Sequence, residues 1–318
     1  MLPSSTTDHG PRTHTDHAPP YHHPDTAALI QASLLEDLRF IGDLTCQALV
    51  PRSARLRATV TAKAAGVVCG LPLFDRVLAA LGGRVTIEVC ALDGTPVTPG
   101  DVVLEAVGDA HALLVAERTA LNLCQRLSGT ATLTRRYVDA VAGTRAKILD
   151  TRKTTPGMRL LQKHAVLAGG GVNHRIGLYD QVLIKENHIA LMPPGAHGGS
   201  PAEAVRRCRA QLGVHVLIEV EIERIADLHA CIAAGADIVL CDNLPPAALR
   251  EAVAIRDRLA AAAPAGTRAV ALEASGGITL ASVRAVAETG VDRISTGELT
   301  HSVSALDLSM RCVQVPLA

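Results

Sequence analysis

Tryptophan is absent from the 318-residue chain, and the three aromatic residue types together make up only 2% of it. The 31 Lys and Arg residues are balanced by 31 Asp and Glu residues, so the formal net charge is zero. Proteins that bind nucleic acid generally need a basic surface and aromatic side chains on which bases stack. The sequence therefore argues against a nucleic-acid partner, and any strong electrostatic field must be local.

Paired cysteines and long apolar runs are also absent. The eight cysteines are scattered singly, without a C-x-x-C pair, which excludes a zinc ribbon or a dithiol redox motif. No apolar run is long enough to span a bilayer, and the polar N-terminus lacks the apolar segment of a signal peptide. Hydrophobic residues nevertheless reach 48%, enough for a large core. We therefore expect a soluble cytoplasmic protein with reduced thiols and no membrane partner.

The N-terminal half divides into a tail, a domain and a long helix. Residues 1–24 are rich in His, Pro, Thr and Asp and lack periodicity, which predicts a disordered tail. Its histidines could bind metal only adventitiously, because no rigid scaffold presents them. In residues 25–143, a short helix and alternating runs such as Leu56–Ala62, broken by glycines, predict an α+β sandwich with antiparallel strands. A long helical stretch with an apolar seam follows; Ser128-Gly129 interrupts the seam, which then resumes to Gly143.

Residues 144–318 alternate between apolar strands and helices, which predicts a parallel sheet. The expected strands cover 146–149, 181–184, 214–220, 237–240, 269–272 and 292–294. The expected helices between them include 202–212, 225–234, 246–263 and 280–289. Nearly every strand ends in polar or charged residues, as in (β/α) barrels, where catalytic groups lie at the C-terminal ends of several strands. We therefore predict an α/β protein with an incomplete barrel of six or seven strands, whose last helix can pack on the N-terminal domain.

The densest group of polar side chains runs from Asp150 to Lys185. Its potentially cationic members are Arg152, Lys153, His174, Arg175 and Lys185, from two strand ends and one Gly-rich loop. Gathering that much positive charge in a small volume is costly unless a polyanion neutralises it. Guanidinium groups suit carboxylates and phosphates, so the pattern indicates a polyanion site. A solvated basic surface with ion pairs is the alternative.

Two Gly-containing turns and two carboxylates complete the predicted site. The turns are Ser275-Gly276-Gly277 and Ser295-Thr296-Gly297, and the loops after the last strands of a barrel often hold a phosphate. Glu221 and Asp242 close adjacent strands, where they could bind ribose hydroxyls, hold Mg²⁺ on a polyphosphate, or act as counter-ions to the cationic cluster. Glu219 shares a strand face with Glu221, and we favour Glu221 because it is nearer the strand end.

These motifs resemble those of the quinolinate phosphoribosyltransferase family (nicotinate-nucleotide pyrophosphorylase, carboxylating). The resemblance rests on segments that cover the chain from about Glu36 onward and arrive in the family's order. They include Glu117–Asn122, Ser128–Ala131, Asp150–Gly157, Gly169–Arg175, Lys185–His188, Glu219–Glu221, Cys241–Asn243, Ser275–Gly277 and Gly297–Thr300. Ala274 and Glu298 depart from the residues usual in the family at their positions.

The resemblance implies a homodimer with shared active sites that makes nicotinate mononucleotide, CO2 and pyrophosphate from quinolinate and phosphoribosyl pyrophosphate. It implies that quinolinate is bound by Arg118 of the neighbouring subunit together with Arg152, His174, Arg175 and Lys185. Lys153, Glu221 and Asp242 would act on the ribose and pyrophosphate side with Mg²⁺, which Glu221 and Asp242 could hold directly or through the substrate. Thr151, Ser275, Gly276, Gly277, Thr296 and Gly297 would complete the substrate contacts.

Three other functions stay open on the sequence. The same fold could act on another aromatic carboxylate, as in the related molybdenum-transport-associated proteins. Lys153 or Lys185 could form a Schiff base in an aldolase-type lyase, which borohydride trapping would reveal. The chain could also be a sensor that binds phosphoribosyl pyrophosphate without turnover. Retention of Arg118, Arg152, Arg175 and Lys185 together favours a dicarboxylate substrate.

Overall fold

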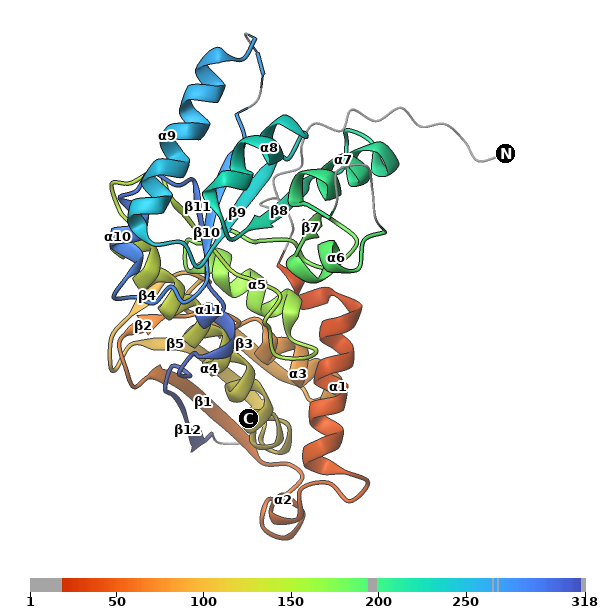
Figure 1. Ribbon diagram of the computed structural model, residues 1–318. Coiled ribbons are helices and arrows are strands. Elements are labelled where there is room, and N and C mark those ends of the chain that lie inside the picture. The colour runs from red at the N-terminus through yellow and green to blue at the C-terminus, as the bar shows by residue number, and fades with distance from the viewer. Residues whose placement is uncertain (1–18, 194–198, 265, 268, 316–318) are drawn as a thin grey trace.

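The computed structural model describes residues 19–193, 199–264, 266–267 and 269–315; the disorder expected for residues 1–18 lies outside these ranges. Two large sheets occupy the two halves of the molecule, with the helix α4 (Ala110–Ala140) between them in the chain (Figure 1). Within the described ranges, no helix is both long and apolar enough to cross a membrane.

The N-terminal sheet is antiparallel, with strand order β12-β1-β5-β3. Its strands are β1 (Arg55–Ala62), β3 (Val85–Val89), β5 (Val102–Asp109) and β12 (Leu308–Gln314), and β2 (Gly66–Val67) pairs separately with β4 (Pro96–Val97). Alternate residues of β1 are buried, namely Ala58, Val60 and Ala62, so the alternation in the sequence does mark an antiparallel strand with one face on the core. The helices of this half are α1 (Pro24–Leu38), α2 (Leu44–Leu49) and α3 (Leu73–Leu81).

The ordered structure starts earlier than the predicted end of the tail at residue 24. A 3₁₀ turn, η1 (Pro20–His22), precedes α1, and Tyr21 within it is only 5% exposed. His23 caps α1 by accepting a hydrogen bond from the Asp25 amide at 3.1 Å. The prediction for residues 19–24 is therefore wrong, because one aromatic ring among many polar residues was enough to dock the segment.

Ser128-Gly129 interrupts the apolar pattern but not the helix, since α4 runs through it unbroken. Small residues here serve close packing instead. A Cβ atom on Gly129 would lie 2.2 Å from the carbonyl oxygen of Ser304. The hydroxyl of Ser128 accepts a hydrogen bond from the Cys69 amide at 2.9 Å. Glycine allows other chain segments to approach the helix at a distance that any side chain would forbid.

The C-terminal sheet has six parallel strands in the order β6-β11-β10-β9-β8-β7. They are β6 (Lys147–Leu149), β7 (Val182–Ile184), β8 (Ile218–Ile222), β9 (Ile238–Asp242), β10 (Ala271–Ser275) and β11 (Arg293–Ser295). Among the described residues, the edge strands β6 and β7 do not pair with each other, and only one bridge, Leu149 to Val172, adds to β6. The six parallel strands of the predicted barrel are thus present, and the sheet is not closed.

Helices connect these strands in the expected alternation. They are α5 (Arg159–Ala168), α6 (Glu186–Ala190), α7 (Pro201–Leu212), η2 (Ile225–Asp227), α8 (Leu228–Ala233), α9 (Pro246–Ala262), α10 (Val283–Ala287) and α11 (Glu298–His301). Figure 1 shows α7, α8 and α9 beside the strands of the upper half, while α4 lies nearer the lower half. Because α4 contributes to the hydrophobic cores of both halves, no gap in packing separates residues 25–143 from the rest.

The last helix, α11, packs on α4 as expected, with Glu298 accepting a hydrogen bond from Tyr137, but the last described element is a strand that the sequence did not predict. β12 pairs antiparallel with β1, and Figure 1 shows its dark blue arrow beside β1 in the lower half. Leu308 is buried, and Met310 and Cys312 pack against the N-terminal core, so alternate residues face inward. The chain therefore returns from the C-terminal sheet to complete the N-terminal one.

Candidate active site

A pocket of about 670 Å³ lies at the C-terminal ends of the parallel strands. Its walls are formed by Thr151, Arg152, Lys153, His174, Arg175, Leu183, Lys185, Glu186, Glu221, Glu223, Leu240, Asp242, Asn243, Ser275, Gly276, Gly277 and Ser295. All five members of the predicted cationic cluster line it, together with both predicted carboxylates. The arrangement can accommodate a ligand with several negative charges.

The loop that carries His174 and Arg175 is held from below by a buried ion pair. Lys163 Nζ in α5 lies 2.7 Å from Asp150 Oδ1, and the two side chains are 2% and 0% exposed. Asp150 also accepts a hydrogen bond from the His174 amide at 2.8 Å, and Lys163 donates to the His174 carbonyl at 2.9 Å. Burial raises the pKa of Asp150 to about 6, although Lys163 opposes the shift.

His174 and Arg175 lie above two fully buried carboxylates. His174 Nε2 is 3.0 Å from Glu219 Oε2 and 3.4 Å from Glu273 Oε1, while its Nδ1 accepts a hydrogen bond from the Arg175 amide at 2.7 Å. Both ring nitrogens are thus engaged within the protein. Burial lowers the pKa of His174, and Glu273 and Glu219 raise it by holding the ring proton on Nε2, while Nδ1 stays unprotonated as the acceptor of the Arg175 amide. Burial and the neighbouring Arg152 lower the pKa of Arg175.

The carboxylates at the ends of β8 and β9 face the same pocket. Glu221 forms an ion pair with Lys185, which is 45% exposed at its side chain. Burial raises the pKa of Glu221, Lys185 lowers it, and the nearby Asp242 raises it again. Asp242 accepts a hydrogen bond from the side-chain amide of Asn243 at 2.6 Å. Two carboxylates that repel one another beside a pocket are suited to share a cation.

The turn after β10 exposes backbone to the pocket. Gly276 and Gly277 have φ values of +91° and +58°, in the left-handed region. A Cβ atom on Gly276 would lie 2.3 Å from Asn243 Oδ1. The backbone N–H of Asn243 donates a hydrogen bond to the Ser275 carbonyl at 2.9 Å. Glycine is therefore required for this turn, which leaves backbone N–H groups available to an anion.

Two family models match the chain: the quinolinate phosphoribosyl transferase N-terminal domain over residues 43–128 and its C-terminal domain over residues 130–311. The chain belongs to the quinolinate phosphoribosyltransferase family. A probable nicotinate-nucleotide pyrophosphorylase [carboxylating] of Bacillus subtilis is 45% identical over 282 residues, which are 89% of this chain and 91% of that protein. The nicotinate-nucleotide pyrophosphorylase [carboxylating] of Mycobacterium leprae is 42% identical over 285 residues, 88% of this chain and 95% of that one. The solved structure of the nicotinate-nucleotide pyrophosphorylase of Francisella tularensis, at 38% identity, superimposes with a TM-score of 0.80 over 91% of this chain and 97% of that one.

Two substrate residues that the family resemblance implies lie beside the pocket rather than in its wall. Thr296 is 6% exposed, and its hydroxyl donates to the Ile278 carbonyl at 3.2 Å. A Cβ atom on Gly297 would lie 2.9 Å from Lys153 Cδ, so this glycine gives the lysine side chain its space. Thr296 and Gly297 thus lie beneath Lys153 and the pocket floor.

The two departures from the family pattern also have defined surroundings. Ala274 is 2% exposed in β10 and packs in the hydrophobic core of the C-terminal half, away from the pocket. Glu298 accepts a hydrogen bond from the Tyr137 hydroxyl of α4. Neither side chain lines the pocket, so neither departure from the family pattern changes the charge of the pocket wall.

Arg118 lies elsewhere, exposed on α4. It lines a separate cavity of about 430 Å³ with Ser33, Glu36, Asp37, Thr119, Asn122, Leu123, Arg126, Thr155 and Met158. The ion pair with Glu117 that would explain Arg118 locally is not present among the described residues. A single chain of this quinolinate phosphoribosyltransferase family member therefore does not bring Arg118 to its own pocket.

Asn243, Glu186 and Glu223 line the pocket but were not predicted as site residues. Asn243 follows β9 directly and has a φ of +53°, a conformation that asparagine tolerates better than most residues. Its position after a strand end was the available signal. Glu223 follows β8 in the same way, and Glu186 begins α6, with one residue between it and the end of β7.

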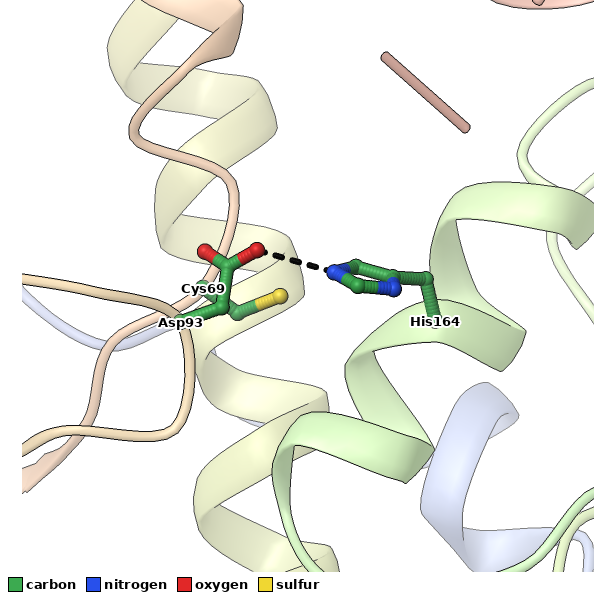
Figure 2. Close-up of side chains that lie close together, drawn as sticks. All are labelled: Cys69, Asp93 and His164. Carbon is green, nitrogen blue, oxygen red and sulfur yellow. Dashed lines mark hydrogen bonds and ion pairs between the residues drawn. The ribbon is translucent and has the colours of Figure 1, made fainter. Parts of the chain in front are cut away.

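A second cluster of polar side chains joins the two halves of the molecule away from the pocket. Figure 2 shows Asp93 and Cys69, from the N-terminal domain, facing His164 of α5. Asp93 Oδ2 lies 2.8 Å from His164 Nε2 and 2.5 Å from the Tyr21 hydroxyl, and Oδ1 accepts from the Gly70 amide at 2.8 Å. Burial alone would raise the pKa of Asp93, but these hydrogen bonds hold it below its usual value. The carboxylate oxygens are satisfied, so the cluster ties η1, the N-terminal domain and α5 together.

Proposed function

We propose that the pocket at the strand ends is where this family member transfers the phosphoribosyl group of phosphoribosyl pyrophosphate to quinolinate. The reaction of the family releases CO2 and pyrophosphate and gives nicotinate mononucleotide for NAD biosynthesis. The observation that carries the proposal is the convergence of Arg152, Lys153, Arg175 and Lys185 in one pocket with two carboxylates. This charge pattern matches a dicarboxylate and a polyphosphate around one ribose.

Quinolinate would lie on the Arg152 and Arg175 side of the pocket. The side chains of these arginines and of Lys185 supply the charge for two carboxylates, and His174 forms the adjoining part of the pocket wall. Electrostatic attraction and fixed orientation of the ring nitrogen toward the ribose are the main contributions of these residues. No residue is required as a covalent nucleophile.

Phosphoribosyl pyrophosphate would occupy the side formed by Lys153, Glu221 and Asp242, with Thr151 beside them. The turn Ser275–Gly277 would bind the 5′-phosphate, supported from below by Thr296 and Gly297. The carboxylates of Glu221 and Asp242 fit Mg²⁺, which prefers oxygen ligands and usually bridges to substrate phosphates. Magnesium, when bound, would neutralise charge on the pyrophosphate.

In this placement, a protein group of opposite charge lies beside each charge that develops during the reaction. The bond between ribose C1 and the pyrophosphate oxygen breaks while Lys153 stabilises the departing anion. Glu221 and Asp242 offset the positive charge that develops on the ribose, and the quinolinate nitrogen forms the new bond to C1. The bond to the 2-carboxylate then breaks, its electron pair is accepted by the cationic ring, and the ring carbon takes up a proton.

Substrate preference tests this placement of charge. Quinolinate should react with a far higher kcat/KM than nicotinate, which lacks the 2-carboxylate, because two carboxylates should meet separate cationic groups. The test is incubation of each acid with phosphoribosyl pyrophosphate and Mg²⁺, with mass spectrometry of the products and initial rates. Comparable kcat/KM values for the two acids would overturn the site assignment.

We also propose that the protein is a homodimer with shared active sites. Two observations support it. Phe40, Ile41, Leu44 and Leu49, in or just before α2, are 96%, 67%, 66% and 76% exposed, and Figure 1 shows α2 at the lower end of the molecule. Arg118 lines a cavity of its own, so it can serve a pocket of a second copy instead.

Complementation between inactive variants tests the sharing of sites. Arg118→Ala and Lys153→Ala homodimers should each be nearly inactive. After subunit exchange, a mixture should recover roughly a quarter of wild-type activity, because about half of the dimers are mixed and each has one intact site of two. A mixture whose exchange is verified by mass spectrometry but whose activity stays at the level of the single variants would refute a cross-subunit role for Arg118.

A further inference from the structure

Glu219 is a fully buried carboxylate beneath the proposed quinolinate site. Its side chain is 0% exposed and does not line the pocket, so a substrate cannot touch it. Its Oε1 atom has no hydrogen-bond partner among the described residues, and neither does Oε1 of the equally buried Glu273. Buried carboxylates without a full set of hydrogen bonds destabilise the folded state, so their presence calls for an explanation.

Two series of contacts, here called arms, connect Glu219 Oε2 to Arg175. The first arm runs through His174, whose Nε2 is 3.0 Å from Glu219 Oε2 and whose Nδ1 accepts from the Arg175 backbone amide at 2.7 Å. The second runs through Gln181, whose side-chain amide donates to Glu219 Oε2 at 2.6 Å. The backbone carbonyl of Gln181 then accepts from Arg175 Nη1 at 3.1 Å.

Every member of these arms is buried. The exposed fractions are 5% for His174, 7% for Arg175 and 5% for Gln181. Water therefore cannot easily replace a hydrogen bond that is lost among these side chains. Glu273 supports the first arm, because it lies 3.4 Å from His174 Nε2 and is itself fixed by Arg293 at 2.7 Å. One carboxylate therefore holds both the backbone and the guanidinium of the arginine that lines the pocket.

We propose that Glu219 is a positioning residue for quinolinate binding, acting on Arg175 through His174 and Gln181, with Glu273 in support. The inference rests on the proposed placement of quinolinate against Arg175. An arginine that must meet a carboxylate with two parallel hydrogen bonds tolerates little error in angle, so its orientation matters as much as its charge. Glu219 adds nothing to phosphoribosyl pyrophosphate binding in this arrangement.

The test is a kinetic cycle of Glu219→Gln, Arg175→Ala and the double variant. Glu219→Gln should raise the KM for quinolinate about tenfold or more and leave the KM for phosphoribosyl pyrophosphate within about twofold, because it misplaces a ground-state contact. In the Arg175→Ala background the same substitution should change the quinolinate KM less than about twofold, since the guanidinium that the two arms position is then missing. Glu251→Gln, on the exposed face of α9, is the matched control and should change neither KM.

A second variant keeps the test decisive where Glu219→Gln does not fold. Gln181→Met breaks only the second arm and should raise the quinolinate KM in the same direction by a smaller factor. The inference is overturned when Arg175→Ala raises the quinolinate KM but Glu219→Gln and Gln181→Met lower only the melting temperature. An Arg175→Ala variant with unchanged quinolinate KM would refute the placement of quinolinate itself, and the inference with it.

Discussion

Replacing Lys163 with methionine should destabilise this protein severely, and the size of the loss should depend on pH. The Lys163 ammonium is the partner of Asp150, a carboxylate that is 0% exposed. Methionine has a similar length and no charge, so the substitution removes the cation without opening a large cavity. What remains is a buried carboxylate that keeps the His174 amide as a donor but has lost its counter-ion.

Breaking a buried ion pair by removing one partner costs about 3–5 kcal/mol, because the other charge stays buried without compensation. At about 2.1 cal/mol/K per residue, the unfolding entropy of this 318-residue chain is about 0.67 kcal/mol/K, so a shift of the melting temperature by roughly 4–8 °C is expected. The loop that holds His174 should also loosen, because Lys163 Nζ donates to the His174 carbonyl at 2.9 Å. A raised KM for quinolinate should accompany the loss of stability.

The pH dependence follows from the pKa of Asp150, which burial raises to about 6 in the native protein. A carboxyl group with a raised pKa binds its proton more tightly in the folded than in the unfolded state. Its contribution to stability therefore falls as pH rises from the usual carboxyl range toward 6. Lys163 lowers this pKa, so the methionine variant should have a still higher value. Protonation of Asp150 should then relieve much of the loss at pH 5 but little of it at pH 8.

Circular dichroism melts of wild type and Lys163→Met at pH 5 and pH 8 measure the effect. The double variant Asp150→Asn/Lys163→Met serves as the control, because it removes both charges, and it should recover part of the lost melting temperature at pH 8. An equal loss for the single variant at both pH values, together with a double variant that is no more stable, would refute the reasoning.

Two further predictions concern contacts outside the pocket. Tyr21→Phe should lower the free energy of unfolding by about 1.5–3 kcal/mol, because it removes a hydrogen bond to the partly buried carboxylate of Asp93. Chemical denaturation measures this, and an unchanged midpoint would show that the N-terminal turn does not stabilise the fold. Gly129→Ala should cost about 1–3 kcal/mol or more, because its Cβ atom would lie 2.2 Å from the Ser304 carbonyl oxygen. Gly82→Ala is its comparison, since no atom lies within 4 Å of a Cβ there and only the backbone conformation is strained.

The sequence predicted the parallel strands well because each is a short apolar run followed by polar residues. Its strand ends were placed too early in four cases, at β8, β9, β10 and β11. Charged residues such as Glu219, Asp242 and Glu273 were interpreted as the ends of strands or the start of loops, whereas they lie within the strands. The buried carboxylates of Glu219 and Glu273 are tolerated there because His174 and Arg293 lie close enough to compensate them. Compensation of this kind is a contact between distant segments, which local patterns do not reveal.

Two other features could not be predicted from local sequence patterns for the same reason. The pairing of β12 with β1 joins residues that are about 250 positions apart, and only its alternation of inward and outward residues hinted at a strand. The cationic pocket was predictable because its members follow strand ends, which all meet at one edge of the sheet. Asn243 was not, since a single polar residue in a left-handed conformation carries no sequence signal beyond its position.

Because β12 belongs to the N-terminal sheet, this sheet cannot be completed until residues 308–314 have been synthesised. Residues 308–314 supply the partner of β1 along one whole side, from Leu56 to Ala62. While a ribosome is still adding the C-terminal half, β1 is an unprotected edge with free backbone N–H and C=O groups. A nascent chain would therefore carry an aggregation-prone edge throughout translation of the second half. A truncated product, or an N-terminal half expressed by itself, would keep that edge permanently, so the two halves of this protein cannot be treated as separable modules.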